Sequence, residues 1–283
     1  MTGEDLPAGL HVVGTPLGNL GDLSPRAAAT LRGADVVACE DTRRTGVLMR
    51  HAGAETRLLS LHAHNEAERV ERVLSLLAAG ARVALVSDAG MPAVSDPGAR
   101  LVDAVHAAGL PVHLVPGPSA VTTALAATGA PADRFAFAGF LPRRDAERAA
   151  LLDGLDPLGL TIVAFESPHR LPAALAWLAG RDPGRRTGVC REMTKRFEEV
   201  AVATAADLAE HFAGDVRGEA TLVLWPATPV PGGGEAALAA TLEVLLAAGL
   251  SPARAADAAA ALGAGSRNAA YRAALTLASR RAT

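Results

Sequence analysis

The chain has 283 residues, of which half are hydrophobic and only 3% are aromatic, and its formal net charge is −3. This length allows two domains with sizeable cores, and the slightly negative charge excludes a protein covered with cations for non-specific nucleic-acid binding. The two cysteines, Cys39 and Cys190, lie far apart in apolar runs, which indicates buried free thiols and a reducing compartment. No apolar run approaches the roughly 18 residues of a membrane-spanning helix, so we expect a cytoplasmic protein without membrane contact.

The first part of the chain alternates strand-like and helix-like segments. Apolar runs predict strands over 10–14, 35–39, 57–61, 82–87 and 111–116. Asn65 followed by Glu68 resembles the capping pair of a helix that ends at Gly80, and a later helix is expected to stop at Gly109. This alternation predicts an α/β domain over 1–117, with a mostly parallel sheet that is covered on both faces.

Beyond residue 117 the strands become longer, and fewer helices are expected between them. The predicted strands are 134–140, 160–167, 198–205 and 219–225. They indicate a second, α+β domain over 118–226. The proline- and glycine-rich stretch 227–234 has the composition of a linker, because neither residue suits the interior of a helix or strand.

An alanine-rich segment over 235–283 predicts a small C-terminal helical module. Ser251–Pro252 has the pattern of a helix cap and first helical residue, "GAGS" indicates a turn, and Ser266 is expected to cap a further helix. From residue 251 onward, five arginines and one aspartate give a charge of +4. This favours an RNA-binding face that includes Arg267 and Arg272, although arginines exposed only to solvent would give the same pattern.

Two loops lie at the carboxyl ends of expected strands, where open α/β sheets bind ligands. The glycines of "VVGTPLGNLGDLS" (12–24) do not fit G-x-G-x-x-G, so this loop is a poor match for dinucleotide binding. In "RVALVSDAGMPAVSDPGARL" (82–101), aspartates stand where a phosphate-binding loop has glycines and a lysine. Asp88 follows its strand directly, which favours a ligand role, whereas Asp96 and Pro97 have the pattern of a helix cap and first helical residue.

Besides these loops, the chain carries "EDTRRTG", "LHAHNE", "PGPSA", "ESPHR" and "REMTK" in order along its length. The whole set resembles the tetrapyrrole methylase-like class of S-adenosylmethionine methyltransferases, and most closely its RsmI-type branch. Enzymes of that branch methylate the ribose 2′-oxygen of a cytidine in the decoding region of bacterial 16S rRNA. Met91 stands where a threonine is expected in that branch.

The resemblance covers nearly the whole chain and implies two α/β domains with S-adenosylmethionine in the cleft between them, followed by the helical module. It also implies 16S rRNA or the small ribosomal subunit as partner, and a homodimer. The cofactor has no phosphate, and its hydroxyl and ammonium groups suit a carboxylate such as Asp88. The implied cofactor-binding residues are Gly14, Pro16, Gly18, Asp88, Ala89, Gly90, Met91, Val94, Ser119, Ala120, Phe165, Glu166, Ala220 and Thr221.

Methyl transfer to a ribose hydroxyl is an in-line displacement, so positioning supplies much of the acceleration, and a base helps because the hydroxyl is a weak acid. Lys195 is the only lysine of the chain, which favours a role for a compact ammonium, although a solvent-exposed lysine is an equal alternative. Which group accepts the proton is left open. The catalytic candidates are Glu40, Asp41, Arg43, His62, His64 and Lys195, with Glu166, His169 and Glu192 as further possible bases.

Some of these residues have a competing interpretation. Asp41 has the position of a helix cap. His62 and His64 have the spacing of a metal-binding pair, but no third ligand is evident, so no metal is expected. His169 and Arg170 open a helix, where phosphate binds naturally. The expected RNA contacts are His169, Arg170, Arg267 and Arg272.

Two other functions stay open at this point. One is a methylase of the same fold that acts on a tetrapyrrole or a protein side chain, although the basic C-terminal module and the "EDTRRTG" and "LHAHNE" segments count against it. The other is a non-catalytic RNA-binding assembly factor, which would keep the fold without using the cofactor.

Overall fold

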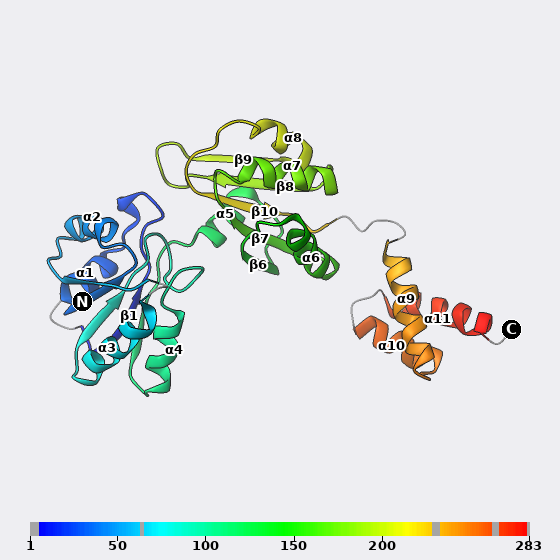
Figure 1. Cartoon of the computed structure of the whole chain (residues 1–283), viewed down its shortest axis with the longest axis horizontal. Coiled ribbons are helices and arrows are strands. Elements are labelled where there is room, and N and C mark those ends of the chain that lie inside the picture. The colour runs from blue at the N-terminus through cyan, green and yellow to red at the C-terminus, as the bar shows by residue number, and fades with distance from the viewer. Residues whose placement is uncertain (1–5, 63–64, 228–232, 262–265, 282–283) are drawn as a thin grey trace.

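The structure is a computed structural model that describes residues 6–62, 65–227, 233–261 and 266–281 (Figure 1). Its first sheet has five parallel strands in the order β3-β2-β4-β1-β5. They are β1 Gly9–Val13, β2 Val36–Cys39, β3 Arg57–Ser60, β4 Arg82–Leu85 and β5 Val112–Val115. Each overlaps a predicted strand, which confirms the parallel sheet.

Helices cover both faces of this sheet. α1 (Pro25–Gly33) and α2 (Thr42–Ala52) pack on one face, and α3 (Glu66–Ala78) and α4 (Ala99–Ala107) pack on the other. The division follows the alternation of side chains along each strand, because Val37 packs with the first helix pair and Ala38 with the second. A short 3-10 helix, Leu20–Asp22, lies in the loop after β1. We call this sheet with its helices the first-sheet half.

α3 begins directly after Asn65, as predicted, but the capping contacts of two helices differ from the predicted ones. The Asn65 side chain does not cap α3, because its Oδ1 accepts from the His62 backbone N–H at 2.8 Å instead. α4 begins after Gly98 and not at Pro97, and the Gly98 N–H donates to Oε1 of Glu66 at 3.0 Å. The assignment of Asp96 as the helix cap was therefore wrong, since a carboxylate from α3 takes that role.

The second sheet is mixed, with the order β6-β7-β10-β8-β9, and only β6 and β7 run parallel. Its strands are β6 Phe135–Phe140, β7 Thr161–Glu166, β8 Arg186–Arg191, β9 Glu199–Thr204 and β10 Ala220–Leu224. The accompanying helices are α5 Ala120–Thr128, α6 Asp145–Leu155, α7 Leu171–Arg181 and α8 Ala205–His211, with a 3-10 turn over Asp156–Leu158. We call this sheet and its helices the second-sheet half. Three described α-helices lie between its strands, against four in the first-sheet half, because α5 precedes β6 and no helix separates β8 from β9, so the expectation of fewer helices between the strands is confirmed.

Strand β8 is absent from the predicted strands. Its sequence, RTGVCR, begins and ends with arginine and contains Gly188, features that disfavour a strand. A Cβ atom at Gly188 would lie 2.6 Å from Cγ2 of Thr128, so the glycine lets α5 pack closely on the sheet. β8 pairs with β10 on one side and β9 on the other, and this pairing decides its conformation. Both Cys39 and Cys190 are buried and free.

Three helices, α9 Gly233–Ala247, α10 Pro252–Ala261 and α11 Arg267–Arg281, form the C-terminal module (Figure 1). They share a core of leucine and alanine that includes Leu242 and Ala259. Ser251 and Ser266 accept the N–H groups of Arg254 and Ala269, which confirms both predicted caps. Most of the predicted linker 227–234 and most of the "GAGS" turn lie outside the described residues. No described helix combines the length and apolar character needed to cross a membrane.

Candidate functional site

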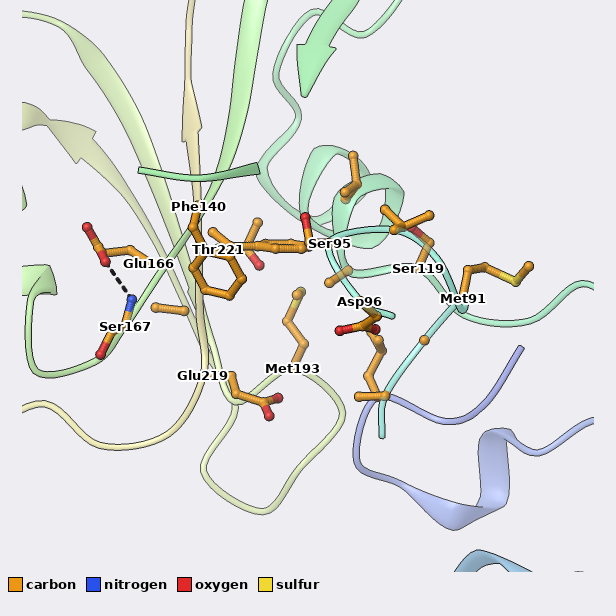
Figure 2. A pocket seen from close by; sticks show the side chains of 18 of the residues that line it. Met91, Ser95, Asp96, Ser119, Phe140, Glu166, Ser167, Met193, Glu219 and Thr221 are labelled. Atoms are coloured by element: carbon orange, nitrogen blue, oxygen red, sulfur yellow. Dashed lines mark hydrogen bonds between the residues drawn. The ribbon is translucent and has the colours of Figure 1, made fainter. Parts of the chain in front are cut away.

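A cavity of about 370 Å³ lies between the first-sheet half and the second-sheet half (Figure 2). The first-sheet half contributes Leu17 and the loop after β4. The second-sheet half contributes the start of α5, the carboxyl ends of β6 and β7, and the start of β10. In Figure 2, Phe140 and Thr221 face Ser119 and Asp96 across the cavity. Its walls therefore come from segments that are far apart in the sequence.

The loop after β4, residues 86–98, is held in an unusual backbone conformation. Thr15 and Gly90 exchange two backbone hydrogen bonds of 2.9 and 3.1 Å, which fasten the loop to the turn after β1. Ala93 and Ser95 have φ angles of 66° and 62°. Such angles cost about 1–3 kcal/mol for a residue with a Cβ atom, and strained positions of this kind cluster at functional sites. The result is that Asp96 lies at the cavity wall.

The Asp96 carboxyl is partly buried and lies close to other carboxylates. Burial raises the pKa of Asp96 to about 6, and the charges of Glu40, Asp88 and Glu219 act in the same direction, while a hydrogen bond with Ser87 opposes them. No cation of the described residues forms an ion pair with it. A carboxyl in this environment changes its charge near neutral pH and is suited to accept a proton.

Three carboxylates, Asp96, Glu166 and Glu219, line the cavity, whereas none of its described lining residues is Lys, Arg or His. Glu166 is only 2% exposed, and burial raises its pKa. Its Oε1 accepts from the Ser167 N–H at 2.6 Å and pairs with Arg170 at 2.5 Å. Its Oε2 makes no hydrogen bond within the described part of the chain, but the side chain is 0% exposed and in Figure 2 its carboxylate points away from Asp96 and Met193, so the acceptors that face the cavity come from Asp96 and Glu219. The cavity thus fits a ligand with cationic and hydroxyl groups and without phosphate.

Most of the predicted cofactor residues line this cavity: Ala89, Gly90, Met91, Val94, Ser119, Ala120, Phe165, Glu166, Ala220 and Thr221. Pro16, Gly18 and Asp88 line an adjoining hollow instead, together with Lys195. Asp88 is also held by an ion pair with Arg44, whose Nη1 lies 3.3 Å from its Oδ2. The structure therefore places Asp88 beside the cavity and Asp96 on its wall.

Gly14 lies behind the cavity wall, where two turns approach each other closely. A Cβ atom at Gly14 would lie 2.5 Å from the backbone nitrogen of Gly117 and 2.7 Å from Sδ of Met91. Met91 itself lines the cavity and packs against the core between the first sheet and helices α3 and α4. Its departure from the expected threonine is accommodated because glycine leaves room for the longer side chain.

Several lining residues escaped the sequence analysis. Ser95 and Asp96 belong to the loop 82–101 that the sequence analysis considered, but their "SDPG" pattern indicated a helix start and not a ligand contact. Glu219 directly precedes the predicted Ala220 at the start of its strand, and Met193 lies within the "REMTK" motif, so both had a usable signal, whereas Phe140 had none. The missed residues are Leu17, Ser95, Asp96, Val121, Phe140, Ser167, Pro168, Met193 and Glu219.

A polar hollow at the carboxyl end of β2 brings together Glu40, Asp41, Arg43, Arg44 and Asp88. The Asp41 side chain caps α2, since its Oδ1 accepts from the Arg43 N–H at 2.7 Å, so the capping interpretation holds. Burial raises the pKa of Glu40, and so does the charge of Asp88. The hollow therefore holds two constrained aspartates, Asp41 and Asp88, and one glutamate whose pKa is higher than usual.

Of the two candidate histidines in the "LHAHNE" segment, the structure describes only His62. His62 lies close enough to Glu40 for a positive charge on its ring to lower the pKa of that carboxyl. His64 lies outside the described residues. Among the residues that the structure describes, no three His, Cys, Asp or Glu side chains gather to hold a metal ion.

Lys195 lies between two glutamates. Its Nζ donates to Oε1 of Glu192 at 2.9 Å and to Oε2 of Glu219 at 3.0 Å. Burial opposes the charge, but these hydrogen bonds outweigh it and raise the pKa of Lys195. The side chain stays an ammonium and is a poor proton acceptor. It also packs over Gly18, where a Cβ atom would overlap its methylene groups, so it joins the two halves of the site.

The predicted RNA contacts do not form one cluster in the structure. His169 is exposed just before α7, and the neighbouring Arg170 turns back to Glu166. Arg267 and Arg272 lie on α11 of the C-terminal module, and Arg267 pairs with Asp257 at 2.6 Å. The exposed members thus lie on two separate parts of the chain.

Comparisons with known proteins agree with this geometry. The sequence model of the family of tetrapyrrole (corrin/porphyrin) methylases matches residues 9–209 of this chain. The ribosomal RNA small subunit methyltransferase I of Mesorhizobium japonicum is 41% identical over 275 residues, which are 96% of this chain and 93% of the relative. The protein of the same name from Mycobacterium tuberculosis is 48% identical over 218 residues, 76% of each chain.

Two solved structures share the fold at low sequence identity. Diphthine synthase is 18% identical with a TM-score of 0.61, and the match covers 77% of this chain and 90% of that one. Uroporphyrin-III C-methyltransferase from Thermus thermophilus, complexed with S-adenyl homocysteine, is 23% identical with a TM-score of 0.54, and the match covers 77% and 97%. These likenesses confirm the expected architecture of two α/β units.

Proposed function

This chain belongs to the tetrapyrrole methylase family and, within it, to the ribosomal RNA small subunit methyltransferase I proteins, and we propose that it methylates the ribose 2′-oxygen of a cytidine in the decoding region of bacterial 16S rRNA. The methyl donor is S-adenosylmethionine. The observation that carries the proposal is the cavity between the two sheets, whose charged lining residues are carboxylates and whose walls carry no described Lys, Arg or His. A cationic nucleoside without phosphates fits such a site.

When bound, S-adenosylmethionine supplies an activated methyl group on a sulfonium. Thr221 and Ser119 offer hydroxyls from the second-sheet half to the polar groups of the ligand. Gly90, with φ of 80°, lets the backbone come close to the ligand. The negative potential of Asp96 and Glu219 favours the cation over a neutral thioether.

Asp96 is the carboxyl best suited to take the proton of the ribose hydroxyl. It lines the cavity, it has no ion pair among the described residues, and its pKa of about 6 is raised by burial and neighbouring charge. Asp88 is paired with Arg44, Asp41 caps α2 and Lys195 is a stabilised cation, so each is less able to accept a proton. The acceptor therefore needs to meet the cavity near Asp96.

The adjoining hollows are the proposed entry for the acceptor nucleotide. The hollow lined by Gly18, Asp88 and Lys195 shares Ala89 and Glu219 with the cavity, so the two adjoin at these residues. Arg43 and the 65% exposed side chain of Arg44 lie at the start of α2. Cations at this end of a helix are opposed by its dipole, and an RNA phosphate would offset that cost.

Two measurements test the proposal. Titration calorimetry should detect S-adenosylmethionine binding, and labelled cofactor should methylate unmethylated small subunits or naked 16S rRNA. Binding without label in either RNA would favour a methylase with another acceptor. Absence of cofactor binding at high concentration would favour a non-catalytic assembly factor.

The resemblance to the rRNA branch also supports a homodimer that acts in the cytoplasm. In a two-fold assembly, one protomer can extend the RNA surface of the other. Sedimentation equilibrium checks this directly, because a mass of one chain at working concentrations contradicts it.

A further inference from the structure

The loop between β8 and β9, residues 192–198, forms a strap from the second-sheet half to the first-sheet half. Thr194 Oγ1 accepts from the Asn19 N–H at 3.2 Å, and the Lys195 side chain packs over Gly18. Met193 extends from this strap into the cofactor cavity (Figure 2). The strap therefore lies at the edge of the reacting centre and contacts both halves.

The strap is held rigidly in a conformation that is unfavourable in itself. Glu192 and Thr194 have φ angles of 50° and 67°, in the left-handed region. The Lys195 and Glu198 N–H groups donate to the carbonyls of Glu192 and Lys195 at 3.0 and 3.1 Å, and the Thr194 N–H donates to Oε2 of Glu198. These bonds, with the ion pairs of Lys195, offset the backbone strain and fix the direction in which the next residues project.

Phe197 projects into solvent from this fixed strap and is 66% exposed. The guanidinium carbon of Arg196 lies 5.5 Å from the centroid of its ring. A phenylalanine left in water loses the stabilisation that burial gives, so folding alone does not explain this position. An exposed aromatic ring beside an arginine is the arrangement on which single-stranded nucleic acids stack their bases.

We propose that Phe197 and Arg196 form a stacking platform for an unpaired base that flanks the methylated nucleotide of the RNA substrate. This inference rests on the proposed function. Phe197 lies four residues from Met193, so their Cα atoms are at most about 14 Å apart, which keeps the ring beside the cavity. Arg196 is exposed beside the ring, and a cation at this position favours RNA over an apolar protein partner. Arg217, which is 87% exposed and lies 3.5 Å from Asp215, is also near the base of the strap, because the adjacent Gly218 packs against the Glu192 side chain.

The test compares three variants of the full chain. Phe197→Ala removes the ring, Phe197→Trp keeps an aromatic surface, and Leu158→Ala removes a similarly exposed apolar side chain, 57% exposed, at the 3-10 turn after α6. Each is assayed for KM and kcat on unmethylated small subunits, for the Kd of S-adenosylmethionine and for oligomeric mass.

We expect Phe197→Ala to raise the KM for subunits by about 5-fold to 150-fold, the range for one base stack, and to leave the cofactor Kd unchanged. Phe197→Trp should stay close to the wild type, as should Leu158→Ala. A KM for Phe197→Ala equal to that of Leu158→Ala overturns the platform, and so does a change of oligomeric mass, which would make Phe197 a protein contact. If the wild type itself fails to methylate any subunit or rRNA, the proposed function fails instead.

Discussion

Replacing Asp96 with asparagine tests the proposed proton acceptor, because it removes the charge and nearly preserves the shape. Without a base at this position, methyl transfer should slow by about 10²-fold to 10⁴-fold in kcat. For the wild type, activity should rise with pH through about 6, as Asp96 loses its proton. The variant should lose this step in the pH profile.

The same substitution should make the fold more stable at alkaline pH. The pKa of Asp96 is about 6 in the folded chain and 3.8 in the unfolded chain. The free energy of unfolding therefore falls as the pH rises from 3.8 to 6, and above pH 6 the full loss is present. This shift corresponds to at most about 3 kcal/mol, and partial exposure reduces it to about 1–2 kcal/mol. The substituted asparagine carries no charge, so the free energy of unfolding should increase by this amount at pH 8.

The assay pairs single-turnover methylation with thermal unfolding at pH 8 and at pH 5. Asp103→Asn, which alters an exposed aspartate on α4, is the matched control and should change neither quantity. A variant at Asp96 that keeps wild-type kcat, or that unfolds at a lower temperature at pH 8, would refute the reasoning. Loss of activity combined with gain of stability would distinguish a functional carboxyl from a structural one.

Three further outcomes follow from the site. Gly14→Ala should lower the free energy of unfolding by about 2–3 kcal/mol, because its Cβ would meet the backbone of Gly117. Gly154→Ala in α6 is the control, since the space around Gly154 is open, and it should not destabilise the fold. Equal thermal midpoints for the two variants would contradict the close contact at Gly14. Binding of S-adenosylmethionine near pH 6 should release a proton from Asp96, because the cation favours the ionised carboxylate. In calorimetry the binding enthalpy should then depend on the ionisation enthalpy of the buffer, and this dependence should be weaker for the neutral S-adenosylhomocysteine. Identical proton release for both ligands would contradict an ionised Asp96 beside the cation. Deleting residues 233–283 should weaken RNA binding and spare cofactor binding, and an unchanged RNA affinity would show that the basic module has no such role.

The parallel sheet was predictable because each strand is a short apolar run that ends in turn residues. β8 was not, since Gly188 serves the packing of α5 and its neighbours supply the pairing that its own sequence does not indicate. Asp96 shows the same limit at the site. Its local pattern has every feature of a helix cap, and only the tertiary contact from Glu66, 32 residues before Gly98, shows that the cap comes from elsewhere.

The motifs located the walls of the site better than the roles of individual side chains. Asp88 follows β4 as expected, yet Arg44 holds it in the neighbouring hollow. Whether a carboxylate faces a ligand or an arginine depends on helix α2, which is placed by the packing of Leu48 and Met49 in the core. No pattern within the loop itself carries that information.

Lys195 also makes the chain a convenient substrate for protein chemistry. Apart from the α-amino group, its side chain is the only primary amine among the 283 residues. An amine-directed fluorophore or cross-linker therefore attaches at one defined side chain, beside the cofactor cavity, without any engineered cysteine. Its raised pKa calls for alkaline labelling conditions, and a bound cofactor or RNA should slow the reaction. The rate of modification of one nitrogen thus becomes a direct reporter of whether the cleft is occupied.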